Sequence, residues 1–307
     1  MSSTPPSANA LTLKAMRRIR EVVPKRNREL LAKVDEVVDL LSSPPAAEAQ
    51  EQATGGEVEE ADKYFPYFQA ACESGEAKVM ELALDGLHAL VEYGYLRGMK
   101  VLLPRAQEAA PTHPPPAQPQ AEAVFPSPPR TLMDSIIEVV CKCSDEFNDG
   151  VQLQVIKVLL TAVTSLQCQV NESSLLLAIR ACFHIHLISK SSINKVTTKA
   201  ALTQMVNAVN AKMEASDARL KASSSSERLH AQLSALPNSS SSDAGDLPAA
   251  VKSTQAAAAA ATPVQFASVQ HKDSFLLFRA LCKLSMKGLH DDAQESLQAD
   301  AVAMQNK

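Results

Sequence analysis

Residues 150–165 read Gly150-Val-Gln-Leu-Gln-Val-Ile-Lys-Val-Leu-Leu-Thr-Ala-Val-Thr-Ser165, a stretch in which apolar side chains outnumber polar ones. On a helix its polar side chains form one narrow stripe, made by Gln154, Lys157, Thr161 and Thr164 or Ser165. Because so much apolar surface is unstable in water, such a helix must be covered on both flanks. The stretch therefore predicts a central helix in a stack of packed helices.

The surrounding sequence continues this helical periodicity and lacks the alternation that is typical of strands. Helices are predicted within 11–41, where Pro24 separates two pieces, and at 77–93, 131–147, 151–168, 172–189 and 194–214. Asp149-Gly150 and the predicted N-caps Asn171 and Asn194 mark short turns, and short turns make successive helices antiparallel. We expect an all-α fold, an armadillo- or HEAT-like helical solenoid interrupted by disordered segments, although no strict repeat is visible.

Segments of biased composition divide the chain. We expect disorder at 1–10, a helical domain at 11–214 with a linker at 42–60 and a disordered insertion at 103–130, a low-complexity linker at 215–270, and the start of a further region at 271–307. The insertion holds nine of the 18 prolines, which block helix formation. A last helix begins near Lys272 with an apolar face and nothing after it to pack against, so we expect the front part of a longer protein.

Composition excludes several classes of protein. The net charge of -4 offers no general attraction for nucleic acid, and the aromatic content of 4% is low for a sheet protein. The six cysteines lie in helical parts without a secreted framework, which favours a reducing cytosol. Neither a signal peptide nor a run of about 18 apolar residues is visible, so no membrane span is predicted.

Two clusters resemble metal ligands, Cys141-x-Cys143 and Cys182-x-His184-x-His186. Side chains two positions apart on a helix point to nearly opposite sides, so we interpret these as core cysteines with partly exposed histidines. No phosphate-binding glycine loop or nucleophile motif occurs either. We predict no metal site, no cofactor and no catalytic residue.

Residues 14–33 hold eight Lys or Arg against Glu21 and Glu29. A basic helix of this kind can bind an anionic membrane surface, but basic runs are more often a solvated helix face, and we favour the solvated face.

The helix at 172–189 has a poor polar stripe, essentially Arg180 and His184. Its surplus apolar surface indicates contact with a partner or a second copy, or cover by another helix. The candidate residues for self-association or contact between domains are Gln154, Lys157, Thr161, Arg180, Phe183 and Leu187.

Several longer segments occur in a fixed order. They are Glu60-Ala-Asp-Lys-Tyr-Phe65, Leu84-Asp-Gly-Leu-His-Ala-Leu-Val-Glu-Tyr-Gly94, residues 150–165, Ala178-Ile-Arg-Ala-Cys-Phe-His-Ile-His-Leu-Ile-Ser-Lys190, Thr198-Lys-Ala-Ala-Leu-Thr-Gln-Met205 and Lys272-Asp-Ser-Phe-Leu-Leu-Phe-Arg-Ala-Leu-Cys-Lys-Leu-Ser-Met-Lys287. Together they resemble the N-terminal dimerisation and cyclophilin-binding domain of the large brefeldin-A-inhibited Arf guanine-nucleotide exchange factors. The last segment resembles the start of the next homology region of that family.

The resemblance implies a non-catalytic module that self-associates, docks on other domains of the exchange factor and contacts a GTP-bound Arf-like small GTPase. It implies a cytoplasmic protein, peripheral on the trans-Golgi membrane, that acts in vesicle-mediated transport; whether cyclophilin binding is retained stays open. The implied GTPase-contact residues are Leu87, His88, Glu92 and Tyr95, with Ala89 where the family has a long polar side chain. The exchange domain's F-R-L-P-G-E-like loop is not found, so no exchange activity is expected of this chain.

Overall fold

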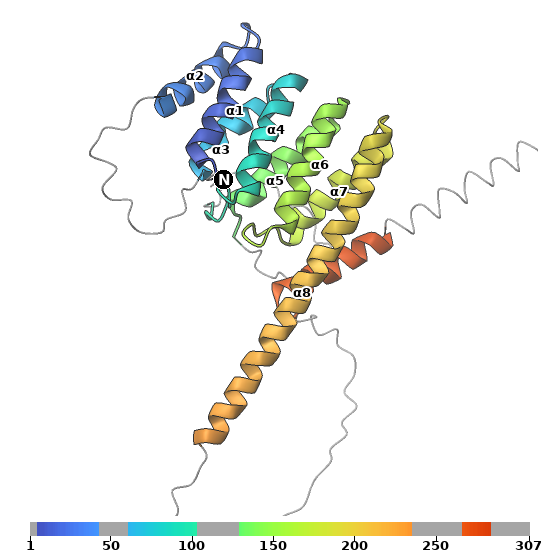
Figure 1. The fold of residues 1–307 in the computed structure, drawn as a ribbon. Helices are drawn as coiled ribbons and strands as arrows, with labels where there is room; N and C mark the ends of the chain where they lie inside the picture. The colour runs from blue at the N-terminus through green and yellow to red at the C-terminus, as the bar shows by residue number, and fades with distance from the viewer. Residues whose placement is uncertain (1–4, 43–60, 103–128, 235–265, 284–307) are drawn as a thin grey trace, which may run out of the picture.

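A computed structural model describes residues 5–42, 61–102, 129–234 and 266–283. In these ranges the regular structure is helical, apart from an antiparallel bridge between Val101 and Thr131, and the helices lie side by side in a stack (Figure 1). The predicted all-α, armadillo- or HEAT-like fold is therefore confirmed. Nearly all of the predicted linker at 42–60 and of the predicted disordered insertion at 103–130, and most of the predicted linker at 215–270, lie outside the described residues.

The stack is built from four helical hairpins followed by a crossing helix at 269–283. The elements are α1 (Ala8–Val22), α2 (Arg28–Ser42), η1 (Asp62–Tyr64), α3 (Phe65–Cys72), α4 (Ala77–Glu92), α5 (Leu132–Lys142), η2 (Cys143–Asp145), α6 (Asp149–Thr164), α7 (Glu172–Ile188) and α8 (Ser192–Ser234). Pro24 lies between α1 and α2, as predicted.

The helices form two layers that bury their apolar stripes against each other. In the first layer α1 packs on α4, α4 on α6 and α6 on α8; in the second, α2 packs on α3, α3 on α5 and α5 on α7. The largest fully buried side chains include Met16, Phe68, Leu87, Ile136 and Leu159, which come from five helices on both sides of residues 103–128. The two parts of the chain therefore share one core.

Local hydrogen bonds set where the helices begin and end. Asn148 accepts from the N–H groups of Gly150 and Val151 at the start of α6, and Thr131 forms a capping box with Asp134 at the start of α5. Gly94 ends α4 with a φ of 73°, a conformation that glycine adopts without strain. Asn194 is not the N-cap we predicted, because α8 begins at Ser192 and the buried Asn194 amide donates to the Asp149 carbonyl oxygen at 2.9 Å.

Several predicted boundaries are wrong, including the end of α6, which lies at Thr164 rather than at 168. The α5 helix ends at Lys142 and tightens into a 3-10 turn rather than continuing to 147. The first helix already begins at Ala8, where Ser7 accepts from the Ala10 N–H. The last helix of the stack, α8, runs to Ser234 instead of stopping at 214, and its second half projects from the stack (Figure 1). No Gly or Pro occurs between 192 and 234, and serine is only about 0.7 kcal/mol or less worse than alanine in a helix, so nothing stops α8 at its serine run.

The helix at 269–283 returns to the stack and lies across α8 (Figure 1). Its Leu277 is buried, although we expected its apolar face to remain without a packing partner within the chain. Asp273 accepts from the Glu172 N–H at 2.6 Å, and Lys272 pairs with the Glu172 carboxylate at 2.8 Å. His271 Nε2 lies 3.0 Å from the carboxylate of Asp217 on α8.

Asp273 supplies the N-cap that α7 lacks locally. Asn171 precedes α7 as predicted, but its side chain makes no capping hydrogen bond. In the amide orientation that satisfies both of its side-chain polar atoms, Asn171 instead donates to Asp273 Oδ2 at 3.0 Å. Burial raises the pKa of Asp273 from 3.8 to about 6, while the hydrogen bond from Glu172 opposes that rise.

A substitution at Gly86 tests how closely α1, α3 and α4 approach one another. A Cβ at Gly86 would lie 2.6 Å from a ring carbon of Phe68 and 2.8 Å from Ala15 Cβ. We expect Gly86→Ala to lower the free energy of unfolding by about 1–3 kcal/mol through overpacking, although alanine favours helix. Gly150→Ala is the milder control, because its nearest neighbours, the side-chain ends of Glu81 and Asn148, lie 3.1 Å or more from the added Cβ. Urea unfolding followed by circular dichroism measures both, and a Gly86→Ala chain more stable than wild type would contradict the close packing.

Two substitutions of Asp273 test whether its side-chain oxygen caps α7. We expect Asp273→Ala to lower the free energy of unfolding by about 1–2 kcal/mol, since the Glu172 N–H loses its acceptor. Asp273→Asn keeps an oxygen for that N–H, so it serves as the matched variant. The comparison is made by urea unfolding near pH 4, where Asp273→Asn should match wild type, and equal losses in the two variants there would contradict the capping role.

The stability that Asp273 contributes to the folded chain decreases as pH rises. Because its pKa is higher in the folded chain, the folded state binds more protons between about pH 4 and pH 6, and the stability contributed by Asp273 falls as pH rises through this window. Asp273→Asn should therefore equal wild type near pH 4 and exceed it by about 1–2 kcal/mol above pH 7. A difference in urea midpoint that stays constant with pH would show that the carboxyl is not perturbed.

Candidate functional site

The structure brings two of the predicted sets of contact residues onto one surface. His88 and Glu92 of α4 lie on the solvent side of the first layer, beside Gln154, Lys157 and Thr161 of the neighbouring α6. We call these five residues the α4–α6 surface. Glu92 and Lys157 are exposed, and the other three are half-buried. The sequence placed these residues in two separate sites, because it does not reveal that α4 and α6 are neighbours.

Opposite charges flank His88 on this surface. His88 Nδ1 lies 3.8 Å from the Glu92 carboxylate. Burial lowers the pKa of His88, Glu92 opposes this, and the nearby Lys157 ammonium lowers it further. The ring is therefore neutral at pH 7. Gln154 Oε1 is buried and finds no donor among the described residues, so this acceptor is unsatisfied beneath the surface.

The other predicted GTPase-contact residues are placed differently. Leu87 is fully buried in the core, so its side chain is not part of the surface that a partner would meet. Tyr95 is half-buried and stacks on Tyr93, with ring centroids 6.3 Å apart. Tyr93 is exposed and was missed by the sequence analysis, although an aromatic residue directly before the helix-ending Gly94 could have indicated it. Ala89 is half-buried on α4.

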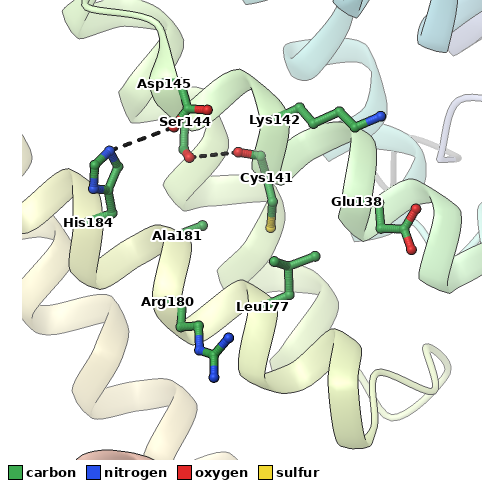
Figure 2. A pocket seen from close by; sticks show the side chains of 9 residues that line it. All are labelled: Glu138, Cys141, Lys142, Ser144, Asp145, Leu177, Arg180, Ala181 and His184. Atoms are coloured by element: carbon green, nitrogen blue, oxygen red, sulfur yellow. Dashed lines mark hydrogen bonds and ion pairs between the residues drawn. The ribbon is translucent and has the colours of Figure 1, made fainter. Parts of the chain in front are cut away.

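The predicted residues on α7 face two different directions. Phe183 lines a groove between α7 and α8 that Leu202 and Val206 also line, whereas Arg180 and Leu187 are exposed. Arg180 lines a second groove, between α5 with its η2 turn and α7, which has a volume of about 430 Å³ (Figure 2). We call it the α5–α7 groove.

The α5–α7 groove has an apolar floor and charged rims. Its floor is made by Cys141, Leu177 and Ala181, and its lining also includes Glu138, Lys142, Ser144, Asp145, Arg180 and His184 (Figure 2). His184 Nε2 lies 3.7 Å from the Asp145 carboxylate, whereas Arg180 points away from that pair. Such a groove can hold an apolar side chain of a partner and orient it with opposite charges.

The cysteines of the two suspected metal clusters are packed in the core. Cys141, Cys143 and Cys182 are buried, and burial raises the pKa of Cys182 to about 12. His184 and His186 have separate neighbours, Asp145 and the Lys195 carbonyl oxygen. Across residues 5–42, 61–102, 129–234 and 266–283, no group of three or more His, Cys, Asp or Glu has the arrangement needed to hold a metal ion.

Half of the basic residues at 14–33 are neutralised by carboxylates. Arg18 pairs with Asp85 at 2.7 Å, Arg20 with Asp35 at 2.6 Å and Lys33 with Glu29 at 2.8 Å, and Arg26 pairs with Glu76. These pairs reduce the positive potential that an anionic surface would meet.

Among the helices that the structure describes, none combines the length and the apolar character required to cross a bilayer.

Comparison with known sequences gives consistent matches. The family described as "Mon2/Sec7/BIG1-like, dimerisation and cyclophilin-binding domain" matches residues 9–217. Brefeldin A-inhibited guanine nucleotide-exchange protein 1 of Mus musculus is 41% identical over 157 residues, which cover 50% of this chain and 7% of that protein. Brefeldin A-inhibited guanine nucleotide-exchange protein 2 of Arabidopsis thaliana is 30% identical over 207 residues, covering 62% of this chain and 10% of that protein.

A fungal relative extends the match further along the chain. The ADP-ribosylation factor guanine nucleotide-exchange factor sec71 of Schizosaccharomyces pombe is 28% identical over 247 residues, covering 76% of this chain and 12% of that protein. The chain thus spans a small part of each of these relatives. Since the family match covers more than half of the chain, the protein belongs to the Mon2/Sec7/BIG1-like dimerisation and cyclophilin-binding domain family.

Proposed function

We propose that this chain is a non-catalytic regulatory and interaction module of an Arf guanine-nucleotide exchange factor. In this proposal it self-associates, and a GTP-bound Arf-like small GTPase recruits it from the cytoplasm to the trans-Golgi membrane in vesicle-mediated transport. The names of the relatives support the link to Arf exchange factors, and the family description supports dimerisation and cyclophilin binding.

The observation that carries the proposal is the α4–α6 surface. It presents the exposed Glu92 and Lys157 side chains on two packed helices, with the exposed Tyr93 ring at one end. Aromatic and charged side chains on a fixed backbone are the usual anchors of protein–protein interfaces. A small GTPase whose surface changes with the bound nucleotide is the partner that we assign to it.

The α4–α6 surface predicts a charge-dependent interaction. We expect Lys157→Glu to weaken binding of the GTP-loaded Arf-like GTPase at least about fivefold, because a charge reversal at an interface introduces repulsion. Calorimetry or pull-down with GTP-loaded and GDP-loaded GTPase measures the effect. Lys142→Glu makes the same charge change on α5, in the second layer, and should bind as wild type does.

Two results would contradict GTPase-dependent recruitment. One is equal binding of the GTP and GDP forms, or of neither, by the wild-type chain. The other is binding to vesicles of anionic lipid without any GTPase, lost when Lys25 and Arg28 are reversed in charge. That second result would favour the membrane-binding adaptor, which uses the basic residues at 14–33.

A further inference from the structure

The loop after the η2 turn carries an apolar side chain that the fold leaves in solvent. Phe147 is 80% exposed, in the short connection between η2 and α6. Two positions earlier, Asp145 lines the α5–α7 groove. Phe147 itself borders a neighbouring hollow with Ile188 and Lys190 near the end of α7. The projecting aromatic ring thus follows, by two residues, a side chain that lines an open groove with an apolar floor. An exposed phenylalanine beside a groove of this kind is a common feature of interaction sites.

The two rims of the α5–α7 groove carry opposite charges. The rim on the η2 side carries Asp145, whose side chain is 81% exposed, and the rim on the α7 side carries the exposed Arg180. Arg180 points away from Asp145 and forms no ion pair among the described residues, and Asp145 is near His184, which counts as a cation only when protonated (Figure 2). Each rim therefore holds a charge that the other rim of a second molecule could neutralise.

We propose that a second copy of this chain docks on this surface about a two-fold axis, with Phe147 of each copy in the α5–α7 groove of the other. In a two-fold contact the same patch serves both molecules, so every interaction occurs twice and the assembly closes at two copies. Arg180 of each copy then meets Asp145 of the other. Leu187, exposed one turn along α7 from His184, widens the apolar contact. This inference rests on the proposed self-association and names the surface that performs it.

The alternatives on this molecule are less suited to a second copy. Leu166 is 89% exposed, but it lies beyond the other end of α6, in the connection to α7. The groove between α7 and α8, with Phe183, is bordered by Leu281 of the 269–283 helix, so a later part of the chain already contacts it. The α5–α7 groove carries both the ring-sized space and the paired charges.

The test measures self-association of the full chain by sedimentation equilibrium from micromolar to about 100 µM. We expect Phe147→Ser to raise the dissociation constant of the dimer at least about tenfold, since truncating a central aromatic anchor has effects of this size. Leu166→Ser is the matched control, because it removes an equally exposed apolar side chain from the other end of α6, and it should dimerise as wild type does. Both side chains are exposed, so both variants should keep the wild-type helix content and urea midpoint.

A charge exchange tests the two-fold geometry independently. Arg180→Glu and Asp145→Arg should each impair self-association, because each homodimer would place like charges together. An equimolar mixture of the two variants should restore dimers, since both contacts then join opposite charges.

The outcomes separate this inference from the function on which it rests. A wild-type chain that stays monomeric throughout the concentration range would overturn self-association itself. A wild-type dimer that Phe147→Ser leaves as strong as Leu166→Ser does, or charge variants that a mixture fails to restore, would overturn the surface assigned here and leave self-association standing.

Discussion

The packing of α4 against α6 is the contact on which the other features depend. These helices lie on opposite sides of residues 103–128, yet they are neighbours in the first layer and bury leucines and valines such as Leu90 and Val158 completely. Each buried side chain of this kind contributes about 1.5–3 kcal/mol. The Val101–Thr131 bridge joins the two segments that flank residues 103–128, with the Leu132 N–H donating to the Lys100 carbonyl oxygen at 2.8 Å. The same contact forms the α4–α6 surface, so the scaffold and the candidate site have one origin.

The sequence predicted the helices well where apolar periodicity and a capping signal agree. The helix at 77–92 differs from the prediction by one residue, and α7 ends one residue early. The sequence-based prediction placed the end of α8 too early. The helix continues through Ser223 because no glycine or proline interrupts it. The prediction also failed at Asn194, whose amide serves α6 rather than its own helix. Periodicity identifies a helix, but it does not reveal which neighbour a polar side chain will meet.

The candidate sites were less predictable for the same reason. The polar stripe of α6 was predicted from the sequence. Its position beside His88 and Glu92 was not, because α4 and α6 are neighbours although 56 residues separate them in the sequence. Leu87 was assigned to a partner because its segment resembles a family, whereas its complete burial places it in the core. The cap that Asp273 supplies to α7 comes from 101 residues away, and no local pattern could indicate it.

The central claim is that both parts of the chain form one cooperative helical stack. Hydrogen exchange of the full chain measures this most directly, by comparing wild type with Leu159→Ala, which removes a fully buried side chain of α6 and should cost about 2–5 kcal/mol. If the stack is one cooperative unit, amides of α1 and α4 lose as much protection as those of α6. Loss of protection confined to α5, α6, α7 and α8, with α1 and α4 unchanged, would show two independent units and contradict the account.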